Sequence, residues 1–208
     1  MEIREKVLQR ASEMFRTMGV KNITMDNLAA DLGMSKRTIY EMFDQKERLV
    51  MESIHYMILE ENAELRKIID SSEHVVEALF LIIRRKKEHR RTYPHVFVED
   101  IKKYLPKVQV MFFSNHEDLK KYSASYILLE RGMNEGIFRK DIKIELVDNF
   151  LQEIISLIHN SQRILALKPK DSELLNSIFI PYFRGLCTPK GLNLMTKFFE
   201  ELNVLNPS

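Results

Sequence analysis

The sequence predicts an all-α protein, with a three-helix helix-turn-helix head over residues 1–46 and a larger helical domain over residues 47–208. The 208 residues include only 6 Gly and 6 Pro, which are few turn formers for a chain of this length. Long segments are rich in Leu, Ile, Met, Glu and Lys, which favour helices. Apolar residues also recur every three or four positions, the period of a helix with one buried face.

Composition limits the cellular setting and the class of partner. Hydrophobic residues make up 45% of the chain and charged residues 30%, so a globular core is expected, while the net charge of +2 neither requires nor excludes nucleic acid. Cys187 is the single cysteine, which suits a reducing compartment, and we interpret it as a buried, inert thiol rather than a redox sensor. The apolar run 75–83 is shorter than the roughly 20 residues that cross a bilayer, and MEIREKVLQR lacks the apolar stretch of a signal peptide. We therefore expect a cytoplasmic protein.

The first predicted helix covers residues 2–18 and ends at Gly19. Its apolar residues are spaced by three or four positions, so they share one face of the helix. They are Ile3, Val7, Leu8, Ala11, Met14, Phe15 and Met18.

Two short helices follow, each preceded by a hydroxyl residue that can cap free backbone N–H groups. Thr24 precedes a helix over 25–32 that ends at Gly33, and Ser35 precedes a helix over 36–43. The apolar positions that can face a common core are Leu28, Leu32, Ile39 and Phe43.

The remainder of the chain reads as longer helices separated by Gly, Pro and Ser. Proline disfavours helical conformation in the residue before it, so we expect a short helix between Pro94 and Pro106 with irregular ends. The other predicted helices cover 45–70, 73–91, 108–114, 116–135, 144–167, 172–186 and 189–203.

Two short helices joined by a tight glycine-containing turn are typical of a helix-turn-helix motif, whose second helix enters the DNA major groove. Ala29 is small where the two helices approach, and Gly33 can adopt a positive φ. On the second helix, Arg37 is suited to phosphate or to guanine O6 and N7, and the Tyr40 hydroxyl to a further phosphate. Lys46 can anchor the flank of the motif. The predicted DNA-binding residues are Thr24, Ser35, Lys36, Arg37, Thr38, Tyr40 and Lys46.

The stretch from residue 24 to residue 49 resembles the head of the TetR family of transcriptional repressors. The positions that carry the resemblance are Thr24, Leu28, Ala29, Gly33, Ser35, Thr38, Ile39, Tyr40, Phe43, Lys46, Glu47 and Leu49. The chain departs from the family at Arg37, where glycine is frequent, and at Met42, where histidine or tyrosine is frequent. A weaker resemblance covers ERGMNEGIFRKDI at 130–142.

The resemblance implies a homodimer that binds a palindromic double-stranded operator as a repressor and is released by a small-molecule effector. Family members dimerise through their last long helices, here 144–167 and 172–186. The residues expected at the dimer interface are Leu151, Ile154, Ile158, Leu175, Phe179, Tyr182 and Phe183. An apolar effector pocket in the larger domain is expected from Tyr56, Phe80, Phe97, Tyr104, Met111, Phe112, Tyr126, Met133 and His159.

Two alternatives stay open at this point. Glu52 and His55 form one Glu-x-x-His motif, which carboxylate-bridged di-iron bundles contain twice, so we expect neither a metal site nor an enzyme. No zinc-ligand spacing or phosphate-binding loop occurs in the sequence, and no cofactor is expected. A DNA-binding or adaptor protein without an effector is the second alternative. We interpret the basic run at 84–91 as a solvated face.

Overall fold

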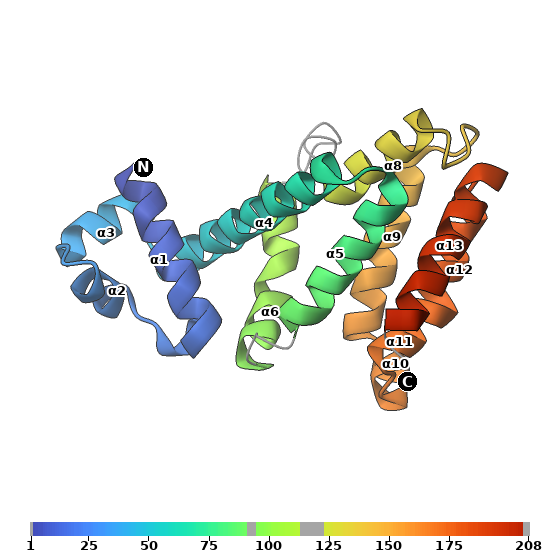
Figure 1. Ribbon diagram of the computed structural model, residues 1–208. Helices are drawn as coiled ribbons and strands as arrows, with labels where there is room; N and C mark the ends of the chain where they lie inside the picture. Colours follow the sequence, from blue (N-terminus) through green and yellow to red (C-terminus); the bar gives the residue numbers. More distant parts are fainter. Residues whose placement is uncertain (1, 91–94, 113–122, 206–208) are drawn as a thin grey trace. The chain divides into compact units, whose positions relative to one another are not determined.

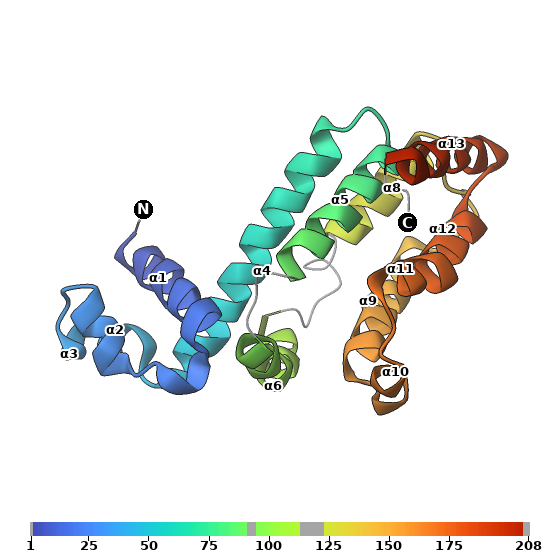
Figure 2. The same ribbon diagram turned by 60° about the horizontal axis from the view of Figure 1, so that its bottom comes forward.

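The structure of the protein, a computed structural model, describes residues 2–90, 95–112 and 123–205. The described residues are almost entirely helical, as the sequence predicts (Figures 1 and 2). Among them, one isolated antiparallel bridge joins Phe138 to Cys187, and no strand is formed. The elements are α1 (Ile3–Met18), η1 (Val20–Asn22), α2 (Met25–Asp31), α3 (Lys36–Phe43), α4 (Lys46–Ser71), α5 (Val75–Arg90), α6 (His95–Phe112), α8 (Ala124–Asn134), α9 (Ile144–Asn160), α10 (Gln162–Leu167), α11 (Asp171–Leu174), η2 (Leu175–Phe179), α12 (Ile180–Leu186) and α13 (Pro189–Leu205).

The described residues pack as two compact units, each with its own core. Among the described residues, the first unit comes from 2–64, 88–90 and 95–112, and the second from 65–87 and 123–205. The predicted boundary at residue 46 separates a DNA-binding head from the rest of the chain by function rather than by packing. It stays a prediction.

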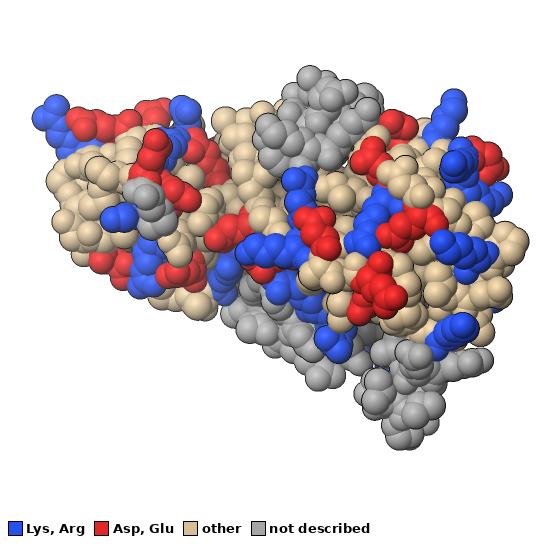
Figure 3. Space-filling view, turned by 45° about the horizontal axis from the view of Figure 1, so that its top comes forward, with Lys and Arg blue, Asp and Glu red and all other residues tan. Residues whose placement is uncertain are grey.

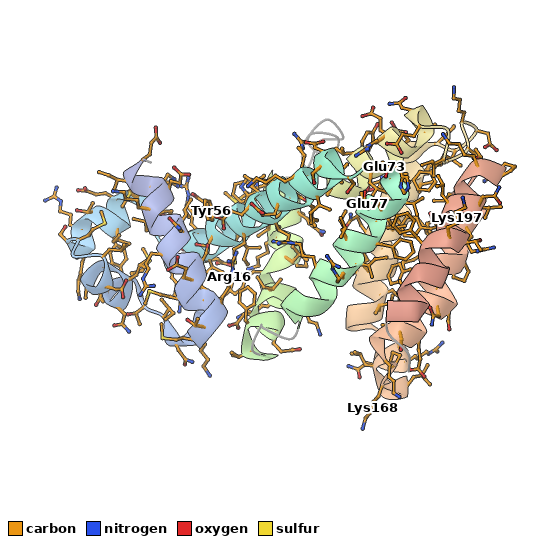
Figure 4. The ribbon with its side chains drawn as sticks, viewed as in Figure 1. Arg16, Tyr56, Glu73, Glu77, Lys168 and Lys197 are labelled. Carbon is orange, nitrogen blue, oxygen red and sulfur yellow. The ribbon has the colours of Figure 1, made fainter. Side chains whose placement is uncertain are left out.

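The core of the first unit joins α1, α2, α3, the first part of α4, and α6. Phe15, Leu28, Ile39 and Phe43 are fully buried in it, as the spacing of apolar residues predicts. Arg16 of α1 and Tyr56 of α4 (Figure 4) both reach Glu60, at 3.7 Å for the ion pair and 2.9 Å for the hydrogen bond that the Tyr56 hydroxyl donates. Polar contacts thus border the apolar seam between these two helices.

Helix α6 corrects one prediction, because it continues through Pro106 instead of ending before it. A proline inside a helix removes one backbone hydrogen bond at a cost of about 3 kcal/mol. Phe97 and Val108, on opposite sides of this position in sequence, are both buried in the first core, while Pro106 itself is exposed. Burial of one continuous apolar face therefore offsets the loss at the proline.

The second unit is tied together by the segment 130–142. The Arg131 guanidinium donates to the Ile69 carbonyl and, at 2.8 Å, to the Ser72 carbonyl, so it satisfies the C-terminal end of α4. Its Nε also pairs with Glu135, whose other oxygen accepts a 2.8 Å hydrogen bond from the Val75 N–H at the start of α5. Two neighbouring charges thus fix the corner between α4 and α5.

Two further predicted helices are interrupted. The predicted helix 144–167 is two helices, because Ser161 is extended at φ −73° and ψ 118° between α9 and α10. Asn160 and Ser161 are residues whose side chains compete with the helical backbone. Within the predicted helix 172–186, the π turn Leu175–Phe179 is followed by Ile180 and then Pro181. A wider turn is a common accommodation where a helical hydrogen bond is lost.

The predicted helix 116–135 corresponds to α8, and its first part falls outside the described residues. Among the residues that the structure describes, no helix is long and apolar enough to span a membrane.

A pair of glycine substitutions tests the packing of the second unit. A Cβ on Gly132 of α8 would lie 2.2 Å from Cδ2 of the buried Phe138 ring, whereas a Cβ on Gly185 of α12 would meet no atom within 4 Å. We expect Gly132→Ala to lower the free energy of unfolding by about 1–3 kcal/mol through overpacking. Gly185→Ala should leave it unchanged or raise it by up to about 1 kcal/mol through helix propensity. Urea denaturation measures both, and equal effects of the two variants would contradict the packing at Phe138.

Candidate nucleic-acid interface

The turn between α2 and α3 fixes the second helix against the first. Gly33 has φ +64°, and the N–H groups of Gly33 and Met34 donate to the carbonyls of Ala30 at 3.1 Å and Ala29 at 2.8 Å. These two hydrogen bonds form a Schellman motif, which ends a helix with a left-handed residue. The predicted role of Gly33 is confirmed: its backbone conformation is one that a side chain penalises.

Both predicted helix caps are present at this turn and before it. Thr24 Oγ1 accepts a 3.0 Å hydrogen bond from the Asn27 N–H, and Ser35 Oγ accepts one of 3.1 Å from the Thr38 N–H. The hydroxyls of Ser35 and Thr38 also lie 2.8 Å apart. The caps leave other N–H groups of each first turn pointing out of the helix end, where an anion is favoured.

Helix α3 has one buried and one exposed face. Ile39 and Phe43 have no exposed surface, and they hold the helix on the core of the first unit. Tyr40 is 47% exposed, and the Arg37 side chain is 87% exposed. The exposed face of α3 therefore presents a positive charge, from Arg37, and a hydroxyl that can form hydrogen bonds, from Tyr40.

The exposed cations of this face are held by carboxylates in the free protein. Arg37 Nε lies 2.7 Å from Glu41 Oε1 one turn later, and the Lys36 ammonium pairs with Asp26 of α2. Exposed ion pairs of this kind contribute little to stability, so a phosphate can replace the carboxylate at small cost. Sequence reasoning did not identify Asp26 as a partner, because its pairing depends on how α2 and α3 cross.

Lys46 differs from the other predicted contacts, because it is half-buried at the first position of α4. Burial lowers the pKa of its ammonium, and the nearby Asp100 carboxylate of α6 opposes this shift. Only part of this side chain is therefore available to a phosphate.

Charge on the visible surface is mixed rather than gathered in one basic patch. Figure 3 shows Lys and Arg interleaved with Asp and Glu on the face drawn there, in keeping with a net charge of +2. DNA binding must therefore rely on the placement of a few side chains on α3 rather than on bulk charge.

Comparison with known proteins supports this interpretation of the first unit. Residues 7–52 match the model of the bacterial regulatory proteins of the tetR family. The chain is 26% identical over 155 residues to the HTH-type transcriptional repressor KstR2 of Mycolicibacterium smegmatis, which covers 72% of this chain and 74% of that protein. Residues 7–52 therefore resemble the DNA-binding head of that family, and the two similarities support a DNA-binding transcriptional regulator.

Solved structures share the fold across the chain. A TetR-family transcriptional regulator from Pectobacterium atrosepticum is 17% identical with a TM-score of 0.62, covering 89% of this chain and 94% of that one. CifR, a TetR-family regulator solved in complex with 26-base-pair double-strand operator DNA, is 17% identical with a TM-score of 0.53, covering 88% and 99%. At this identity the likeness concerns the fold alone.

The residues expected to line an effector pocket fall into both compact units. In the first unit Phe97 is buried, Tyr104 and Phe112 pack against the core, and Met111 is 47% exposed. Tyr56 is hydrogen-bonded to Glu60, and burial together with this carboxylate raises its pKa to about 12. Phe97, Tyr104 and Phe112 therefore belong to the apolar core of the first unit or pack against it, whereas Met111 is exposed.

The pocket residues of the second unit also lie in or beside its core. Phe80 is buried and stacks on Phe198 with ring centroids 5.7 Å apart, and Met133 packs against the same core. Tyr126 is buried, and its hydroxyl donates a 3.3 Å hydrogen bond to Glu145. His159 was also predicted to line the pocket, but its side chain lies outside the described residues. The expected pocket stays a prediction.

The residues expected at the dimer interface divide by burial. Leu151, Ile158 and Phe183 are buried within the second unit, so they serve the chain's own interior. Ile154, Leu175, Phe179 and Tyr182 are partly exposed. The large exposed apolar side chains of α9 are Leu146 at 66%, Phe150 at 51% and Leu157 at 56%, which sequence reasoning did not single out.

The Glu-x-x-His pair of α4 has other contacts. Glu52 accepts from Arg4 and, at 3.0 Å, from Arg48, while the His55 ring stacks on Phe112 with centroids 4.1 Å apart. Among the described residues, no group of three or more His, Cys, Asp or Glu side chains is arranged to hold a metal ion. Cys187 is buried, as expected; burial raises the pKa of its thiol to about 11, although the nearby Arg184 lowers it.

Substitutions at Ser35 separate the cap of α3 from its contact with DNA. Ser35→Ala should cost about 1 kcal/mol of stability, whereas Ser35→Asn and Ser35→Asp should stay within a few tenths, since both side chains cap well. We expect Ser35→Asp alone to weaken DNA binding strongly, because its charge repels a phosphate at the helix end. Urea denaturation and a binding titration measure the two effects. Equal DNA affinities of the Asn and Asp variants would mean that no phosphate docks at this end.

Proposed function

We propose that the protein is a cytoplasmic repressor that binds a palindromic operator as a homodimer and is released by a small-molecule effector. The observation that carries the proposal is the two-sided helix α3, with Ile39 and Phe43 buried and Arg37 and Tyr40 exposed. That arrangement suits insertion into the major groove, where base edges are read. KstR2, with which most of the chain aligns, is named a transcriptional repressor, which supports repression.

The dimer is supported by an apolar surface that the described residues leave exposed. Leu146, Phe150 and Leu157 are exposed along α9, and the Phe150 ring lies 5.4 Å from the Tyr182 ring of α12. A surface of large apolar side chains across two helices is suited to a second copy of the same surface about a two-fold axis. Two such copies would bring two recognition helices to half-sites about 34–36 Å apart.

The effector part of the proposal is supported by the chemistry of the predicted pocket residues. They are aromatic or methionine side chains, which suit an apolar or aromatic small molecule, and methionine adapts to ligand shape. An effector must bind the DNA-free state more tightly than the DNA-bound state to release the operator. It would also raise the melting temperature of the free protein, since it binds the native state.

Affinity selection of sheared genomic DNA by the purified protein at moderate salt, followed by sequencing, tests the proposal. We expect enrichment of an inverted repeat near a few promoters, and the neighbouring genes then suggest compounds for melting-temperature and release assays. Retention of fragments without sequence preference would leave only nonspecific phosphate binding and overturn the proposal.

Substitution of Phe150 tests the dimer. Phe150→Glu places a charge in the proposed interface, so we expect monomers by sedimentation at concentrations where the wild type is a dimer. Val110→Glu, which alters a 77% exposed valine of α6, is the control and should remain dimeric. The monomer should also bind the operator more weakly, because one head engages one half-site. Unchanged self-association of Phe150→Glu would place the interface elsewhere.

Arg37 and Tyr40 provide a test of base readout. We expect Arg37→Ala to cost about 1–3 kcal/mol on the operator and much less on random DNA, as for an arginine that contacts a base. Tyr40→Phe, which removes only a hydroxyl, should cost about 1 kcal/mol on both kinds of DNA, as for a phosphate contact. Fluorescence titrations at fixed salt measure the four affinities. Equal losses on both DNAs for Arg37→Ala would remove Arg37 from base readout.

A further inference from the structure

We infer that Arg4, the second residue of α1, is a positioning residue that orients the recognition helix α3 by holding its C-terminal end. The inference rests on the proposed function, because the orientation of α3 matters for activity only if this helix reads DNA. It adds a specific device on α1, outside the helix-turn-helix motif.

The Arg4 guanidinium contacts α3 and α4 at once. Its NH1 group donates a 2.8 Å hydrogen bond to the Met42 carbonyl in the last turn of α3. The central carbon of the guanidinium, Cζ, lies 4.5 Å from the centre of the Phe43 ring, and the NH2 group pairs with Glu52 of α4. One side chain of α1 therefore contacts residues of α3 and α4 that lie 38 and 48 positions later in the sequence.

These contacts suit the physical needs of the end of a short helix. The last carbonyls of a helix have no partner within it, and a cation is favoured there by the helix dipole. Arg4 supplies a donor to one such carbonyl and a positive charge beside it. The guanidinium is planar, so it can lie on the Phe43 ring while its separate N–H groups reach two acceptors.

The Glu52 carboxylate keeps the guanidinium in place. The Glu52 side chain is only 11% exposed, and the Arg4 side chain is 37% exposed, so this ion pair is shielded more than most surface pairs. Glu52 also accepts a 3.0 Å hydrogen bond from Arg48, which belongs to α4. Arg48 shares the carboxylate with Arg4, but the contacts that fix α3 come from Arg4.

The orientation of α3 depends on few contacts because the helix has only 8 residues. Ile39 and Phe43 hold its inner face, and Ser35 caps its start. Arg4 restrains the opposite end of α3 at Met42, which follows Tyr40 and Glu41 in the sequence. Base readout needs side chains placed within a fraction of an ångström, so loosening this end should reduce specific binding more than phosphate binding.

The experiment compares Arg4→Gln with Arg48→Gln. Each variant removes one of the two arginines that pair with the Glu52 carboxylate, so both lose one positive charge at the same place. Each is titrated with a duplex of the most enriched genomic fragment and with a random duplex of equal length, and hydrogen exchange is measured across α3. For Arg4→Gln we expect the ratio of specific to random affinity to fall about tenfold, the usual effect of one charged hydrogen bond. Exchange in the last turn of α3 should also become faster. Arg48→Gln should keep both the wild-type ratio and the wild-type exchange.

An equal ratio of specific to random affinity in the two variants would overturn the inference. Loss of either positive charge would then have the same effect on specific binding, and the contacts of Arg4 with α3 would have none. Faster exchange throughout the first unit in Arg4→Gln would also overturn it, because Arg4 would then serve general stability. If Arg4→Gln does not fold, Arg4→Lys decides: a point charge cannot reproduce the planar contact, so an unchanged ratio and exchange would overturn the inference. Absence of any enriched fragment for the wild type defeats the proposed function instead, while the exchange measurement still tests the restraint.

Discussion

The candidate nucleic-acid interface depends on the burial of one side of α3, a helix that is too short to be stable alone. Isolated helices below about 12–15 residues are marginal in water, and α3 has 8. It is held because Ile39 and Phe43 are fully buried in the core shared with α1 and α4. That burial also determines which side chains remain outside. The positions of Arg37 and Tyr40 on the exposed face are therefore consequences of packing beneath them, together with the cap at Ser35 and the left-handed Gly33.

In the second unit, polar groups at helix ends add to the apolar core. Arg131 and Glu135 satisfy backbone groups at the end of α4 and the start of α5, so the segment 130–142 serves as a corner brace. Gly132 belongs to the same segment for a steric reason, because the Phe138 ring occupies the space of a side chain. A motif that resembles a family pattern is thus explained in this chain by hydrogen bonds and by close packing.

Helix α9 is apolar on two sides, and this limits what its period can reveal. Leu151 and Ile158 face the interior of the second unit, whereas Phe150 and Leu157, their neighbours in sequence, are exposed. An excess of apolar residues indicates that a helix has two apolar faces. The same residue types occur on both faces, so residue type does not tell which face is buried. Periodicity therefore predicted an extensive apolar helix, and the family resemblance implied an interface on it. The assignment of residues to core or surface required the packed neighbours.

By itself the sequence determined the all-α class, the three-helix head, the caps at Thr24 and Ser35, the glycine turn and the exposed cations of α3. These features follow from interactions among residues a few positions apart, which spacing and residue type reveal directly. Tertiary structure alone decided that α6 continues through Pro106, that Lys46 is half-buried, and that Arg4 reaches Met42 and Glu52, 38 and 48 residues away. Each of these outcomes depends on burial and charge contributed by distant elements, and such contributions exist only once the helices have packed.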